Sequence, residues 1–146
     1  MAGRIGLIIE RVEGNVHPLP QYKSRGAAAM DLYSNMPGHT MVSPANVLKV
    51  HTGIKVKIPK GYYGQLLCRG SLGSKGVAVL GGVIDSDYRG EVVAMLTLTR
   101  PGSVDLKPGD RVCQMAILPV PEVIVVEGKV DNDTERGEGG FGSTGR

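Results

Sequence analysis

The sequence predicts an all-β fold, an antiparallel barrel or sandwich of about ten short strands with almost no helix. Apolar or alternating segments of strand length recur at intervals of about 8–12 residues, with turn residues between them. Glycine accounts for 22 of the 146 residues, about twice the usual ~7%, and together with nine prolines it implies many turns. The chain has one phenylalanine and no tryptophan, so the core of this single domain is expected to be aliphatic.

The expected strands follow one another along the chain. The clearest lies within residues 47–58, because residues 54–58 read Ile-Lys-Val-Lys-Ile and so bury one face. Residues 27–30 favour the start of a helix, which a following Pro-Gly pair would cut short. Ser71 is a suitable N-cap for one or two helical turns. Strands are predicted at residues 5–12, 47–58, 62–68, 77–84 (around a Gly-Gly pair), 91–99, 104–106, 111–118 and 122–127.

Charge and cysteine content limit the partners and the location. The net charge of +3 favours an anionic ligand, but the basic residues are scattered and form no run typical of a nucleic-acid-binding surface. Cys68 and Cys113 lack metal-ligand spacing; they fit free thiols of a cytoplasmic protein better than a disulfide. The chain has no signal-peptide pattern and no apolar stretch of ~18 residues, so neither secretion nor a membrane partner is expected.

The chain is organised around residues 80–91, which read Leu-Gly-Gly-Val-Ile-Asp-Ser-Asp-Tyr-Arg-Gly-Glu. The glycines allow tight turns and close approach of the backbone to another molecule. The β-branched pair Val83-Ile84 suits a buried strand, and Asp85 follows at its end. Tyr88 comes three residues later. The residues alone allow two interpretations, a binding pocket or an ordinary turn between two strands.

The last sixteen residues differ in composition from the rest. Residues 136–145 hold five glycines, one arginine, two hydroxyl side chains and the only phenylalanine of the chain. Backbone N–H groups, hydroxyls and a guanidinium all suit phosphate oxygens. The composition also fits a flexible terminus without a role.

Five segments, in order, resemble the five motifs of the homotrimeric deoxyuridine triphosphatases (dUTPases). The resemblance runs from residue 27 to the C-terminus, and it favours the pocket and the functional tail over the two alternatives. The region from residue 73 to residue 85 is more similar to retroviral than to cellular members. The five segments are 27–34 (AAAMDLYS), 69–73 (RGSLG), 81–90 (GGVIDSDYRG), 109–114 (GDRVCQ) and 136–145 (RGEGGFGSTG).

This resemblance implies a jelly-roll-like β-barrel in residues 1–130 and a C-terminal arm in residues 131–146 that completes the active site. The implied assembly is a homotrimer with active sites at the subunit interfaces, in the cytoplasm or associated with a virus. The implied reaction is Mg²⁺-dependent hydrolysis of dUTP to dUMP and pyrophosphate, by attack of water on the α-phosphorus. No nucleic acid or membrane partner is implied.

The resemblance also assigns catalytic roles. Asp85 is implied as the general base for the attacking water, which suits a reaction that depends mainly on positioning and charge neutralisation. Asp31 is implied to hold waters of the Mg²⁺ ion, with no direct protein ligand, as suits an ion that dehydrates reluctantly. Arg69, Ser71 and Gln114 are implied to contact the phosphates from a neighbouring subunit.

Substrate recognition is implied for two further sets of residues. Tyr88 is expected to pack on the deoxyribose where a 2′-hydroxyl would clash, and the backbone of Gly82, Val83 and Ile84 to read the uracil edge. Such a slot would reject cytosine, because mismatched buried polar groups cost ~1–3 kcal/mol each. The arm residues are expected to stack on uracil and grip the γ-phosphate as the arm closes: Phe141 on the base, and Arg136, Gly142, Ser143 and Thr144 around the phosphate.

One departure from the family pattern bears on activity. The family has a serine directly after the basic residue of the second motif, where this chain has Gly70 followed by Ser71. Three consequences are open: Ser71 takes over through a small backbone shift, a backbone N–H serves instead, or activity is reduced. Met30 is a milder change from an aromatic residue. Gly70 leaves open a regulatory or protein-binding module with weak or no catalysis, and the shared barrel leaves open a dCTP deaminase, although the Asp85–Tyr88 run resembles the triphosphatase pattern.

Overall fold

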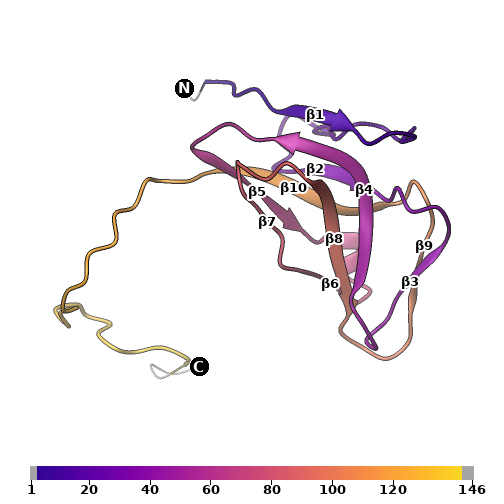
Figure 1. The fold of residues 1–146 in the computed structure, drawn as a ribbon. Helices are drawn as coiled ribbons and strands as arrows, with labels where there is room; N and C mark the ends of the chain where they lie inside the picture. The colour runs from indigo at the N-terminus through magenta and orange to yellow at the C-terminus, as the bar shows by residue number, and fades with distance from the viewer. Residues whose placement is uncertain (1–2, 143–146) are drawn as a thin grey trace.

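The computed structural model describes residues 3–142, and within them the chain forms ten strands and one short helix (Figure 1). Two four-stranded antiparallel sheets, in the orders β1-β4-β8-β6 and β2-β10-β5-β7, enclose the core, and a small β3-β9 sheet lies at one end. The elements are β1 (Ile8–Arg11), β2 (Met30–Tyr33), β3 (Thr40–Val42), β4 (Leu48–Lys57), β5 (Tyr62–Leu67), α1 (Gly70–Gly73), β6 (Val77–Leu80), β7 (Val83–Ile84), β8 (Glu91–Leu98), β9 (Val104–Leu106) and β10 (Arg111–Pro119).

The core is aliphatic, as the composition predicts. Buried and half-buried residues alternate along the whole of β8, so one face of this strand points inward. Val92 and Leu96 on that face are almost completely buried, and Val112 and Met115 of β10 are completely buried in the same cluster. Each such side chain contributes about 1.5–3 kcal/mol by leaving water. The prediction of an all-β fold is confirmed, and the fold is a jelly-roll-like barrel.

The expected helix at residues 27–30 is wrong, because Met30 is the first residue of strand β2. Met30 and Leu32 lie in the core, and β2 pairs with β10 at Met30↔Met115 and Leu32↔Cys113. Tertiary pairing and burial therefore override the local helix propensity of the alanines.

Helix α1 is present, but its first turn differs from the prediction. Arg69, with an extended backbone, is the N-cap, and it makes no side-chain cap hydrogen bond. Ser71 lies inside the helix, and its hydroxyl accepts a hydrogen bond from Arg69 Nη1 at 3.1 Å. The predicted capping role of Ser71 is therefore wrong.

Two strand predictions also fail. Strand β3 is absent from the expected strands, since it has three residues and is defined only by its pairing with β9, at Thr40↔Leu106 and Val42↔Val104. The strand expected at residues 122–127 does not form, because the described chain after Pro119 leaves the barrel as an extended arm without strand pairing (Figure 1). High β-propensity at residues 123–126 is not sufficient to form a strand without a partner.

Both cysteines are free thiols. Burial, followed by the nearby Cys68 and Asp31, raises the pKa of Cys113 to about 12. Burial also raises the pKa of Cys68, although Arg69 opposes this shift. No helix within residues 3–142 is long and apolar enough to cross a membrane.

We expect Cys113 to resist iodoacetamide at pH 8 in the folded protein and to react after unfolding in urea, because the buried thiol stays protonated. Below the ordinary thiol pKa of 9.0 the protonated group contributes fully to stability, and this contribution is lost as the pH rises from 9.0 towards about 12. Mass spectrometry of the alkylated peptides measures the modification. Cys68, which is partly exposed, is the internal comparison; equal rates for both thiols in the folded protein would contradict the assignment.

Candidate functional site

The glycine-rich hairpin forms one wall of a cavity of about 380 Å³. Strand β7 pairs with β5 at Ile84↔Gly64 and ends directly before Asp85, as the sequence predicts. The cavity brings together five of the predicted site residues, with additional lining from β4, β5 and β8: Gly82, Val83, Ile84, Asp85 and Tyr88, with Lys49, Leu66, Val92, Val93 and Met95. The pocket interpretation of residues 80–91 is therefore the one that the structure supports.

The backbone at the start of this hairpin requires glycine. Gly82 has φ +99°, and a Cβ there would lie 3.0 Å from the carbonyl oxygen of Leu66. The Gly82 carbonyl itself accepts a hydrogen bond from the Leu66 N–H at 2.8 Å. Ile84 is buried as expected, but Val83 is 62% exposed, so only one of the pair belongs to the core. The exposed Val83 borders the cavity instead.

Tyr88 is fixed by the residues that follow it. Its hydroxyl donates a hydrogen bond to the main-chain oxygen of Glu91 at 2.7 Å. The phenol lies directly over Gly90, where an added Cβ would approach the hydroxyl oxygen to 2.5 Å. The ring is 45% exposed, so one part of it is held while the rest borders the cavity.

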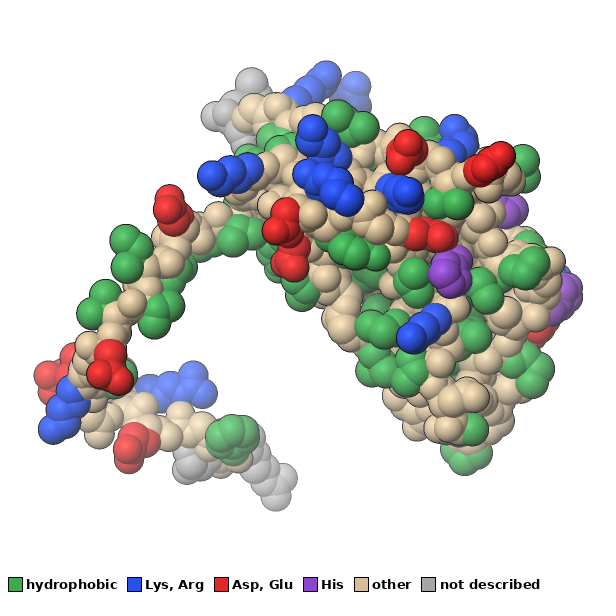
Figure 2. Space-filling view, viewed as in Figure 1, with side chains coloured by type: hydrophobic (Ala, Val, Ile, Leu, Met, Phe, Trp, Pro, Cys, Tyr) green, Lys and Arg blue, Asp and Glu red, His purple; other side chains and the backbone are tan. Residues whose placement is uncertain are grey.

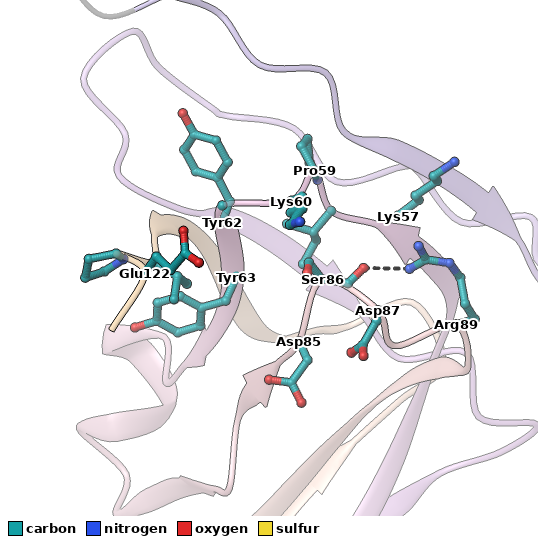
Figure 3. Close-up of a pocket in the computed structure, with 14 residues that line it drawn as sticks. Lys57, Pro59, Lys60, Tyr62, Tyr63, Asp85, Ser86, Asp87, Arg89 and Glu122 are labelled. Carbon is teal, nitrogen blue, oxygen red and sulfur yellow. Dashed lines mark hydrogen bonds between the residues drawn. The ribbon is translucent and has the colours of Figure 1, made fainter. Parts of the chain in front are cut away.

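Asp85 also borders a larger groove of about 950 Å³ on the other side of the hairpin. Figure 3 shows this groove between the β4–β5 turn, the loop after Asp85 and the first residues of the arm. The carboxylate of Asp85 points away from Lys57 and Lys60 in this view, and Arg89 is occupied by a hydrogen bond to the Ser86 carbonyl at 2.7 Å (Figure 3). Asp85 therefore lies at a junction of two hollows, where a carboxylate can reach a water molecule.

A second cluster surrounds Asp31 on β2. Arg69 Nε donates to Asp31 Oδ1 at 3.0 Å, and Arg111 Nη1 lies 3.6 Å from Asp31 Oδ2. The side chains of Asp31 and Arg69 are mostly buried, whereas Arg111 is about half exposed. Two guanidinium groups and one carboxylate leave a net charge of +1, which suits phosphate oxygens.

Three more predicted residues lie around this cluster. Gln114 is paired with Asp31 across β10 and β2, and its Nε2 donates to the Cys68 carbonyl at 3.0 Å. Ser71 accepts a hydrogen bond from Arg69 at 3.1 Å. At Gly70 an added Cβ would meet nothing within 4 Å, so this position has room for a side chain.

The hairpin cavity and the Asp31 cluster lie apart within one chain. Strands β2 and β7 are the two edges of the β2-β10-β5-β7 sheet. Three interstrand spacings of about 4.8 Å place these edges roughly 14 Å apart. Asp31 and Asp85 therefore do not form one site within a single chain.

The arm places its predicted residues away from both regions. The Nε of Arg136 donates to the Gly139 carbonyl at 2.8 Å, and the Gly137 N–H donates to Thr134 Oγ1 at 2.9 Å, so these bonds lie within the arm. Phe141 is fully exposed and has φ +54°, which is unusual for an aromatic residue. Gly142 follows with φ +82°. The predicted residues Ser143 and Thr144 lie outside the described residues.

The donor chemistry agrees with a metal that has no direct protein ligand. Within residues 3–142, no group of three or more histidine, cysteine, aspartate or glutamate residues could hold an ion. Asp31 is engaged by two arginines, and a carboxylate with its roughly four acceptor positions can still accept a hydrogen bond from a metal-bound water. The residues therefore fit Mg²⁺ carried by a polyphosphate and water.

Sequence reasoning missed three residues that contribute to this geometry. Arg111 belongs to the fourth motif, but its pairing with Asp31 depends on the β2–β10 register. The packing of Tyr88 on Gly90 and the role of Glu91 as acceptor are local, and the Tyr-x-Gly-Glu spacing is the signal available for them.

Comparisons with known proteins agree with this geometry. A family model described as dUTPase matches residues 15–145. The deoxyuridine 5'-triphosphate nucleotidohydrolase of Wolbachia pipientis subsp. Culex pipiens is 43% identical over 138 residues, covering 91% of this chain and 90% of that protein. The protein of the same name from Anaplasma marginale is 40% identical over 141 residues, with 94% and 96% covered.

Solved structures show the same fold. A point mutant of the phage 80alpha dUTPase has a TM-score of 0.83 at 23% identity, covering 94% of this chain and 98% of that chain. A Staphylococcus bacteriophage 80alpha dUTPase with dUpNHpp has a TM-score of 0.79 at 25% identity, with 97% and 99% covered. The two relatives above are bacterial, and the similarity to retroviral members stays a prediction. From the matched family model and these relatives, the chain belongs to the dUTPase family.

Proposed function

We propose that this chain hydrolyses dUTP to dUMP and pyrophosphate by attack of water on the α-phosphorus. The reaction lowers the ratio of dUTP to dTTP and supplies dUMP. The observation that carries the proposal is the 380 Å³ cavity, which unites Gly82, Val83, Ile84, Asp85 and Tyr88 in a member of the dUTPase family. The curated relatives bear the name deoxyuridine 5'-triphosphate nucleotidohydrolase.

In the proposed complex, uracil lies against the backbone of Gly82, Val83 and Ile84. The absence of a Cβ at Gly82 lets the base approach the main-chain N–H and C=O groups. Tyr88 forms the wall against the deoxyribose. Asp85, at the end of β7, acts as the general base that orients and deprotonates the attacking water.

The phosphates require a second copy of the chain. Arg69, Arg111, Ser71 and Gln114 form a cationic and polar cluster roughly 14 Å from the hairpin edge, as three strand spacings imply. We therefore propose that the cluster of one subunit faces the hairpin of its neighbour in a homotrimer. Asp31 holds Arg69 and Arg111 in position for phosphate oxygens, and it also accepts a water of the metal ion.

Mg²⁺ fits this site as an ion that arrives with the triphosphate, and when bound it neutralises phosphate charge. A neighbouring structure, the dUTPase of phage phi11, is described with a structural Mg(II) ion. Asp31 is the residue that we propose to hold the ion, through water.

We propose that the barrel domain comprises residues 1–130 and that residues 131–146 form an arm that closes over the site of another subunit. The described arm already extends away from the barrel after Pro119, and the aliphatic residues 123–126 are largely exposed (Figure 1). Such a segment is stabilised by pairing with another chain. On closure, Phe141 covers the uracil, and Arg136, Gly142, Ser143 and Thr144 contact the γ-phosphate.

Charge supports the same arrangement. Residues 120–146 carry six acidic and three basic residues, whereas the whole chain has a net charge of +3. Figure 2 shows acidic side chains along the arm and Lys and Arg side chains gathered over the part of the barrel nearest to it. An acidic arm is attracted to a basic barrel surface of a neighbouring copy. The two free thiols support a reducing compartment, and we propose a cytoplasmic or virus-associated location.

The test is pyrophosphate release from dUTP, dTTP, dCTP and UTP, with and without Mg²⁺. We expect turnover of dUTP alone, and only with Mg²⁺. The Gly70→Ser variant, for which the structure has room, measures the effect of the altered second motif; we expect an unchanged melting temperature and equal or higher kcat. Binding of dUTP without pyrophosphate release would contradict the proposed hydrolysis and favour a binding module. Ammonia release from dCTP would indicate a deaminase.

A further inference from the structure

We propose that Glu91 is a positioning residue that holds Tyr88 in place and thereby sets the preference for deoxyribose over ribose. The inference rests on the proposed function and deepens it, because it explains how the sugar wall of the site is kept rigid. It depends on a bulge in β4, an ion pair at β8 and the phenol of Tyr88.

The bulge lies opposite the start of β8. The β4–β8 register is regular from Leu48↔Leu96 to His51↔Val93, shifts between His51 and Lys55, and resumes at Lys55↔Glu91. Gly53, in the shifted stretch, has φ +71°, and a Cβ there would lie 2.7–2.8 Å from atoms of Asn15 and Asn35. The bulge is therefore restricted to glycine and leaves its N–H without a regular ladder partner.

Glu91 supplies that partner through its side chain. Its Oε2 accepts a hydrogen bond from the Gly53 N–H at 3.0 Å, and its Oε1 lies 3.2 Å from His51 Nδ1. The Glu91 side chain is only 22% exposed. The Gly53 carbonyl is held as well, by the Val12 N–H and by Asn15 Nδ2, both at 2.8 Å. The carboxylate thus joins the first residue of β8 to a rigid part of the neighbouring strand.

The main chain of the same residue holds Tyr88. The Glu91 carbonyl accepts the Tyr88 hydroxyl at 2.7 Å, and the ring lies over Gly90 with no room for a side chain beneath it. A fixed Glu91 main chain therefore fixes the phenol. The chain of contacts runs from Gly53 through the Glu91 carboxylate and main chain to Tyr88.

This matters because the rest of the ring is free. Tyr88 is 45% exposed and borders the cavity that we assign to the sugar and base. A ring that can yield by a fraction of an ångström admits a 2′-hydroxyl, whereas a ring that is held rejects it. Discrimination between the two sugars therefore depends on the anchor as well as on the ring.

A matched control is available in the same sheet. Lys55 lies between Glu91 of β8 and Glu10 of β1, which are its cross-strand neighbours on either side. Glu10 is exposed and belongs to β1, not to the hairpin that carries Tyr88. Glu10→Ala removes the same charge beside the same lysine, without touching the path to Tyr88.

The experiment compares kcat and KM for dUTP and UTP in the intact chain and its variants. For Glu91→Ala we expect the ratio of kcat/KM for dUTP to that for UTP to fall about tenfold, chiefly through a higher KM for dUTP. Glu91→Gln, whose amide oxygen can still accept from Gly53, should restore most of the ratio, and Glu10→Ala should leave it unchanged. Tyr88→Phe should give a loss similar to that of Glu91→Ala, and the double variant should show no further loss.

The outcomes separate the two proposals. A parent chain that does not hydrolyse dUTP overturns the proposed function and this inference with it. A parent that discriminates, combined with an unchanged ratio in folded Glu91→Ala, overturns the inference alone. An equal loss in Glu10→Ala would assign the effect to surface charge and overturn it too. If Glu91→Ala does not fold, the comparison of Tyr88→Phe with the parent decides, and an unchanged ratio there overturns the inference.

Discussion

Asp85→Asn is expected to lower kcat for dUTP by about a thousandfold, because a positioned general base contributes typically 10²–10⁴ to the rate. Asparagine keeps the size of the side chain but accepts no proton. Asp85 lies at the end of β7 on the surface of two hollows and supports no core contact, so the fold should be unaffected. Steady-state pyrophosphate release measures kcat, and calorimetry with dUTP measures the retained binding.

Glu10→Gln is the control for this substitution, since it neutralises an exposed carboxylate on β1. We expect its kcat to equal that of the parent. A kcat for Asp85→Asn within threefold of the parent (roughly 0.6 kcal/mol in barrier height) would show that another group serves as the base. A loss of dUTP binding together with kcat would instead assign Asp85 to substrate binding.

Mixing two inactive variants is expected to restore activity if the site is shared between subunits. In Asp85→Asn the hairpin half is defective, and in Arg69→Ala the phosphate half is defective, which should lower kcat by about a hundredfold. If each site takes Asp85 from one copy and Arg69 from another, random assembly of equal amounts gives about a quarter of the parent activity. The prediction follows from the placement of the two halves at opposite edges of the β2-β10-β5-β7 sheet.

The matched control mixes two defects of the same half. Asp85→Asn and Tyr88→Ala both lie on the hairpin, so a site built from one hairpin and a neighbouring phosphate cluster stays defective in every combination. No recovery is expected there. Differently tagged chains and native mass spectrometry verify that mixed oligomers form. If they form and the first mixture remains inactive, the proposal of a site between subunits is wrong.

Much of the fold could be predicted from local patterns. The alternation at residues 54–58 indicates the inner and outer faces of β4, and the glycine and proline content indicates a fold of short strands and turns. The hairpin before Asp85 is visible in the sequence because β-branched residues end at a carboxylate next to two glycines. These features depend on neighbours in the chain, which is the information that periodicity carries.

The errors share one cause. Residues 27–30 favour helix and residues 123–126 favour strand, yet Met30 starts a strand and the second segment pairs with nothing within the described chain. In both cases the outcome depends on whether a partner strand is present. That information lies more than eighty residues away for Met30, which pairs with Met115.

The sequence by itself determined the fold class, the family and the residue types of the site, because five short motifs and the strand periodicity are local. Only the tertiary structure decided how those residues are grouped. The strand order places Asp31 with Arg69 and Arg111 at one edge and Asp85 with Tyr88 at the other, and the β4 bulge brings Gly53 to the Glu91 carboxylate. Strand order and register arise from hydrogen bonds and burial between distant segments, so the grouping is a property of the folded chain.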